Sequence, residues 1–106
     1  MEDAMSNGDI SFLVVIGERK LKENFIVSLT ETGATVFNVM YGKGFVKSND
    51  FLAAFGFVNE KNKVIVTCLI KKSDCDKTFD MLNKKFKFDC PNTGIAFTIA
   101  VDALKY

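Results

Sequence analysis

The stretch ISFLVVIGERKLKENFIVSLTETG, residues 10–33, contains one change of hydrophobic period, which predicts a strand followed by a helix. Residues 10–16 form an almost continuous apolar run, as expected of a strand that is buried on both faces. Residues 19–32 have the pattern of an amphipathic helix, which Gly33 can end because glycine readily adopts the left-handed conformation found after helices. The apolar residues of this helix recur every three or four positions: Leu21, Phe25, Ile26 and Leu29.

Three further strands are predicted from alternation and from β-branched content. Residues 64–70 are apolar and β-branched almost throughout, which favours a central position in the sheet. After a turn-like cluster, residues 95–101 carry apolar side chains on one face and small ones on the other. Residues 35–41 alternate, and one of their faces is predicted to carry Thr35, Phe37, Val39 and Tyr41.

A second helix is predicted between the third and fourth strands. Ser73 is expected to cap it, and acidic residues in its first turn and lysines in its last turn suit the helix dipole. Its buried stripe is expected to contain Cys75, Phe79, Leu82 and Phe86.

The resulting order is βαββαβ, which predicts an α+β domain of the ferredoxin-like type. Such a domain has a four-stranded antiparallel sheet with two helices on one face. We expect one domain over residues 1–106, with residues 1–9 as a flexible N-terminus. Because every strand also carries apolar residues on the other face of the sheet, that face is expected to be covered by further copies of the chain.

The overall composition argues against several classes of function. The net charge is only +1, which gives no reason to expect nucleic acid or an acidic membrane as a partner. No apolar run is long enough for membrane insertion, so a cytoplasmic protein is expected. The three cysteines lack metal-ligand spacing and the chain has no histidine, so we expect neither a metal site nor an enzyme.

The connection over residues 42–63 is too long for a simple hairpin loop. It is expected to contain a short helix whose apolar side is formed by Phe51, Leu52 and Phe55. Two interpretations remain open at this point. The segment either packs against the core or binds a partner protein.

Two glycine-containing segments are candidates for binding an anion. In Gly42-Lys43-Gly44 the backbone amides can approach an anion closely while Lys43 supplies a positive charge. The second segment lies just before the last strand and offers further amides and a hydroxyl: Asn92, Thr93 and Gly94.

These residues resemble the PII family of nitrogen regulatory signal transduction proteins. The most specific stretch is PNTGIAFTIAVD, residues 91–102, and Tyr41-Gly42-Lys43-Gly44 is similar to the end of the family's second strand. The resemblance implies a homotrimer with ligand sites in the clefts between subunits, where PII proteins bind adenine nucleotides (ATP, ADP or AMP) and regulate a partner protein. Residues 46–60 lack the family's modifiable tyrosine and its glutamine, which points to a PII-like branch.

Three alternatives use the same fold. A trimeric protein of the copper-tolerance type would respond to a metal or ion, although the chain has few metal ligands. An RNA-recognition domain is suggested by Phe55-Gly56-Phe57-Val58, but the flanking residues do not complete that motif. An acylphosphatase-like enzyme would need an arginine cradle, and the single arginine, Arg19, is expected to lie solvated at a helix start.

Overall fold

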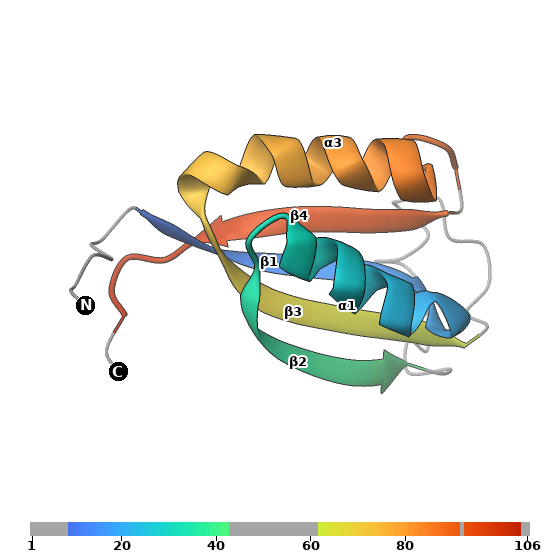
Figure 1. Ribbon diagram of the computed structural model, residues 1–106. Helices are drawn as coiled ribbons and strands as arrows, with labels where there is room; N and C mark the ends of the chain where they lie inside the picture. The colour runs from blue at the N-terminus through green and yellow to red at the C-terminus, as the bar shows by residue number, and fades with distance from the viewer. Residues whose placement is uncertain (1–8, 43–61, 92, 105–106) are drawn as a thin grey trace.

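A computed structural model describes residues 9–42, 62–91 and 93–104. The described part consists of four strands, two α-helices and two short 3-10 turns, in the predicted order. Their bounds are β1 Ile10–Glu18, η1 Arg19–Leu21, α1 Lys22–Glu31, β2 Thr35–Gly42, β3 Lys63–Lys71, η2 Lys72–Asp74, α3 Cys75–Phe86 and β4 Gly94–Ala100. Both helices lie on one face of the sheet (Figure 1). Neither described helix is long and apolar enough to cross a membrane.

The sheet is antiparallel throughout and has the strand order β2-β3-β1-β4. The predicted ferredoxin-like fold and the central position of β3 are therefore confirmed. The core lies between the sheet and the helices, because alternate residues of β1 and β3 point toward Phe25 and Leu29 of α1 and Leu82 of α3. The fully buried members of this core on the strands are Leu13, Val15, Val64, Val66, Cys68 and Ile70.

The end of α1 follows the sequence expectation. Gly33 has a φ of 108°, and its amide bonds to the carbonyl of Thr30 while the amide of Ala34 bonds to that of Leu29. This pair of bonds is the Schellman motif, which satisfies carbonyls that the last turn leaves open. A side chain at Gly33 would also meet the Asp74 carboxylate, with a Cβ only 2.6 Å from Oδ2. Glycine is therefore required here by both conformation and space.

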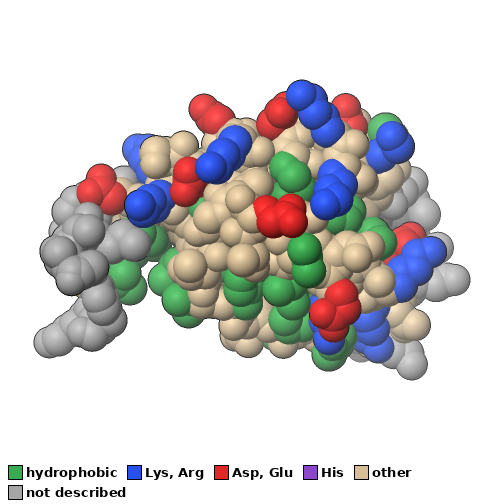
Figure 2. Space-filling model, in the orientation of Figure 1, with side chains coloured by type: hydrophobic (Ala, Val, Ile, Leu, Met, Phe, Trp, Pro, Cys, Tyr) green, Lys and Arg blue, Asp and Glu red, His purple; other side chains and the backbone are tan. Residues whose placement is uncertain are grey.

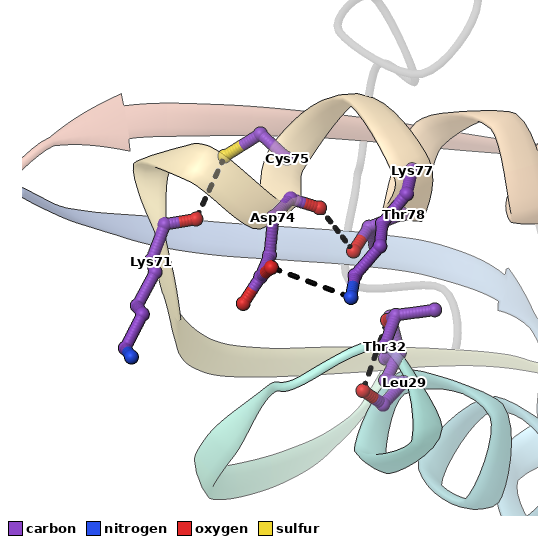
Figure 3. A network of polar contacts seen from close by, with 7 residues as sticks. All are labelled: Leu29, Thr32, Lys71, Asp74, Cys75, Lys77 and Thr78. Atoms are coloured by element: carbon purple, nitrogen blue, oxygen red, sulfur yellow. Dashed lines mark hydrogen bonds and ion pairs between the residues drawn. The ribbon is translucent and has the colours of Figure 1, made fainter.

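The start of α3 differs from the sequence expectation. Ser73 lies inside the 3-10 turn, and the residue at the cap position is Asp74, whose side chain makes no capping bond. The Asp74 side chain instead pairs with Lys77 at 3.4 Å, and its carbonyl accepts a hydrogen bond from the hydroxyl of Thr78 (Figure 3). The tight turn places the Asp74 carboxylate close to Gly33, just after the end of α1.

The alternation predicted along β2 breaks at its first residues. Thr35 pairs with Leu69 and Asn38 with Thr67, which leaves one extra residue in β2. Val36 takes a φ of 56°, an uncommon value for a β-branched residue that accommodates this bulge. Thr35 therefore lies on the same face as Asn38, and its predicted grouping with Phe37 was wrong.

The sheet face opposite the helices is apolar, as predicted. Cross-strand neighbours fall into rows on this face, and we call it the open face. Its apolar members are Ile10, Phe12, Val14, Ile16, Met40, Ile65, Leu69, Ile95, Phe97 and Ile99. Within one chain, Met40 and Ile99 are exposed and five others are only half-buried. On the helices, by contrast, basic and acidic side chains are intermingled (Figure 2).

The described boundaries limit two predictions. Asp9 accepts a hydrogen bond on its carbonyl from the amide of Lys72 at 2.8 Å, so this residue of the predicted flexible terminus is anchored to η2. Residues 1–8 lie outside the described residues, as does the predicted partner-binding segment with Phe51, Leu52 and Phe55.

Candidate functional site

Both candidate anion-binding segments adjoin the same end of the sheet, through Gly42 at the end of β2 and Gly94 at the start of β4. Gly42 pairs with Lys63, which in turn pairs with Glu18 of β1. One residue further in, Gly17 pairs with Gly94. The register therefore places the end of β2 and the start of β4 at one level of the sheet.

Within one chain, however, these two segments do not converge. Because the strand order is β2-β3-β1-β4, Gly42 and Gly94 lie on opposite edges of the sheet (Figure 1). Three strand spacings of about 4.8 Å separate them by about 14 Å. Three further residues of the candidate set, Lys43, Gly44 and Asn92, lie outside the described residues. A single small ligand could contact both segments only where edges of two copies meet.

The hydroxyl of Thr93 is already engaged by its own loop. It lies 2.6 Å from the carbonyl of Lys87 and 2.9 Å from that of Cys90, so its hydrogen is directed to the backbone. In this arrangement the Thr93 oxygen can still accept a hydrogen bond. The side chain orders the loop between α3 and β4, which presents the amides of that loop.

Gly94 has a packing role beside any role in binding. A Cβ at this position would lie 2.4 Å from the ring of Phe88 and 3.0 Å from the carbonyl of Ile16. A cavity of about 270 Å³ opens beside it between α3 and β4. Asn83 supplies the one side-chain amide of its lining, and none of the lining side chains carries a positive charge for an anion: Phe79, Leu82, Asn83, Phe88, Gly94, Ile95 and Ala96.

A cluster that sequence reasoning missed lies beside Gly42. The guanidinium of Arg19 stacks on the ring of Tyr41, with its carbon 4.6 Å from the ring centroid. The ammonium of Lys22 lies 5.9 Å from the same centroid. The two cations are held together by η1, which turns the chain back toward β2 immediately after β1. This Arg19–Lys22–Tyr41 group is called the cationic cluster below.

The environment of each cation in the cluster is distinct. The interaction of Lys22 with Tyr41, and then that with Glu23, raises the pKa of Lys22, so Lys22 is charged at neutral pH. Arg19 is half-buried, and its Nε atom is inaccessible and has no hydrogen-bond partner. Its backbone amide donates to the carbonyl of Asn62 at 3.1 Å. Arg19 is therefore not the solvated residue that the sequence suggested.

Only the sequence neighbourhood could have indicated this cluster. Arg19 is the single arginine of the chain, and Tyr41 directly precedes a candidate ligand segment. Their contact depends on the path of η1 and on the register of β2, neither of which follows from hydrophobic periodicity. Long-range contacts of this kind are outside the reach of local patterns.

The thiols do not form a reactive site. Among the described residues, no group of three or more His, Cys, Asp and Glu side chains could hold a metal ion. Cys68 is fully buried in the core, and burial raises the pKa of its thiol from 9.0 to about 11. The folded state therefore keeps this proton between pH 9 and 11 while the unfolded state loses it. Titration of Cys68 therefore lowers the free energy of unfolding as the pH rises through that window.

Alkylation should separate the three cysteines. With iodoacetamide at pH 8, Cys90 is expected to react first because it is exposed, and Cys75 more slowly because it is half-buried. Cys68 is expected to react only after denaturation. Peptide mass spectrometry over time measures this order, and labelling of Cys68 at the rate of Cys90 in the folded protein would contradict the described core.

The comparisons with known proteins show the fold. No protein-family model and no curated protein matches the sequence. Among solved structures, the chain is similar to CPII, a nitrogen regulatory PII-like protein from Thiomonas intermedia K12 bound to ADP, AMP and bicarbonate. The TM-score is 0.65 and the identity 13%, covering 92% of this chain and 94% of that one.

Two further structures extend this likeness. A putative PII-like signaling protein from Thermus thermophilus has a TM-score of 0.66 at 12% identity, covering 92% of this chain and 90% of that one. Arabidopsis thaliana PII bound to citrate has a TM-score of 0.63 at 14% identity, covering 90% and 79% respectively. The predicted resemblance to PII and PII-like proteins is thus confirmed at the level of the fold.

Proposed function

We propose that this chain is a PII-like regulatory protein that senses a small molecule by binding it and does not catalyse a reaction. Its ligand is an adenine nucleotide (ATP, ADP or AMP) or a similar anion, bound in the clefts between the subunits of a homotrimer. The liganded trimer regulates a partner protein in nitrogen or related metabolism in the cytoplasm. The supporting comparison is CPII, which binds ADP, AMP and bicarbonate on the same fold.

The observation that carries the proposal is the position of the two candidate segments. Their described residues Gly42 and Gly94 lie at one end of the sheet but on opposite edges, about 14 Å apart by strand spacing. Assembly of copies edge to edge would bring Gly42 of one copy near Gly94 of the next. The apolar open face gives such an assembly a driving force, because Met40 and Ile99 are exposed and five more of its apolar side chains are only half-buried in one chain.

Native mass spectrometry of the full chain tests the proposal. The expected spectrum is a trimer that gains up to three nucleotide masses when ATP, ADP or AMP is added. In thermal denaturation, the nucleotide that binds should raise the Tm of the protein, and this rise should grow with the nucleotide concentration. A trimer that binds none of the three would refute the nucleotide, and a monomer would refute the assembly.

The variant Lys43→Ala tests the phosphate contact within this proposal. It removes the charge between two glycines, so nucleotide affinity is expected to fall about tenfold or more, as for loss of a charged hydrogen bond. Lys84→Ala is the control, because Lys84 lies on α3 and pairs with Asp80 at 3.1 Å. Calorimetric titration measures both variants. Equal affinities for wild type and Lys43→Ala would remove Lys43 from the site.

A further inference from the structure

The geometry of the cationic cluster points to a second binding site, and we infer that Arg19, Lys22 and Tyr41 bind a small oxyanion within one protomer. The ligand is a carboxylate or phosphate group. All three residues belong to the same chain, so the site does not require assembly and does not rest on the proposed nucleotide. It lies beside Gly42, next to one half of the proposed cleft.

The first argument is the state of Arg19. Its guanidinium stacks on Tyr41, and its Nε atom is shielded from solvent without a hydrogen-bond partner. A cation that has lost part of its hydration is less screened than a solvated one, so it attracts an anion more strongly. Arg19 is half-buried as a whole, which leaves part of the side chain accessible to such an anion. Its planar group suits the two oxygens of a carboxylate or phosphate.

The second argument is the arrangement of donors around Tyr41. The ammonium of Lys22 lies 5.9 Å from the centroid of the Tyr41 ring, and an ammonium has only hydrogens to donate, so toward Lys22 the phenol oxygen can only accept. The hydroxyl of Tyr41 therefore keeps its own hydrogen for another acceptor. An oxyanion beside the ring edge would receive this hydrogen and would compensate the two positive charges that share one ring.

The acidic groups near the cluster do not fill this role. Glu23 contacts Lys22 at 3.3 Å, but its side chain is 79% exposed and can move away at little cost. Glu18 pairs with Lys20 at 3.6 Å. Neither carboxylate is paired with the Arg19 guanidinium, so within the described part of the chain no ion pair neutralises the charge of Arg19.

A nuclear magnetic resonance titration tests the inference directly on the labelled full chain. Arg19 is the only arginine, so a single side-chain Nε–H cross peak reports on the cluster. That peak and the backbone amide of Tyr41 are expected to shift and saturate with sodium phosphate or sodium acetate. Sodium chloride at the same ionic strength is expected to leave them in place. Saturation with phosphate alone would assign the site to a phosphate group, and saturation with acetate to a carboxylate.

Two variants complete the test. Tyr41→Phe keeps the stacked ring and removes the hydroxyl, so affinity for the saturating anion is expected to fall about tenfold. Lys20→Ala is the matched control. It removes a cation close to the cluster in the sequence, but the Lys20 side chain is 80% exposed and pairs with Glu18. Shifts no larger than with chloride, or equal weakening in both variants, would overturn the inference. Nucleotide binding measured in parallel keeps this outcome separate from the proposed function.

Discussion

Phe25→Ala is expected to lower the free energy of unfolding by about 3–5 kcal/mol, the range found for removing a buried aromatic ring. Phe25 has no exposed surface and lies against Gly17, where an added Cβ would approach its ring to 2.6 Å. It also makes edge-to-face contacts with Phe86 at 4.7 Å and Phe88 at 5.9 Å between centroids. The ring therefore joins α1, the end of α3 and β1.

Urea unfolding measures this effect at one fixed protomer concentration, because assembly would make the midpoint concentration-dependent. A domain of this size has about 5–15 kcal/mol of stability in total, so the variant should unfold at a much lower urea concentration. Val27→Ala is the control on the same helix, since Val27 is 54% exposed and its replacement should cost less than about 0.5 kcal/mol. Similar midpoints for the two variants would mean that the aromatic cluster does not support the core.

Ile99→Glu is expected to convert the proposed trimer into a folded monomer. Ile99 is 52% exposed in one chain and lies on the open face beside Phe12, so a single chain tolerates a carboxylate there. In an assembly that covers this face, each copy would bury an unpaired charge. That penalty is several kcal/mol per ion, enough to prevent association at micromolar concentrations.

Light scattering after size exclusion measures the mass of the particle, and circular dichroism checks that the monomer is folded. Val27→Glu serves as the control, because Val27 has nearly the same exposed fraction but lies on α1, away from the open face. The control should remain a trimer. If Ile99→Glu were also a trimer, the open face would not be the surface that holds the copies together.

The elements of the fold were predictable because their signals are local. The apolar run of β1, the four-residue recurrence in α1 and the β-branched content of β3 each lie within one segment. Gly33 ended α1 as predicted, since left-handed backbone after a helix is a property of the residue itself. The start of α3 was less predictable, because the Asp74 side chain there pairs with Lys77 and lies close to Gly33, which follows α1.

The candidate site was predictable only in part. Gly42 and Gly94 stood out in the sequence, but their positions on opposite edges follow from the strand order. Thr93 was expected to offer a hydroxyl to a ligand, and in the structure this hydroxyl donates to the backbone carbonyls of Lys87 and Cys90. The contact within the cationic cluster could not be predicted from periodicity, because stacking of Arg19 on Tyr41 joins residues that are distant in the chain.

The sequence alone determined three properties of the protein: the order of strands and helices, the apolar character of both sheet faces, and the scarcity of metal ligands and general bases. Periodicity and composition fix these properties whatever the packing. Only the tertiary structure decided three others: the bulge at Val36, the separation of Gly42 from Gly94, and the stacking of Arg19 on Tyr41. They depend on register and on side-chain contacts between distant segments, which are set when the core packs.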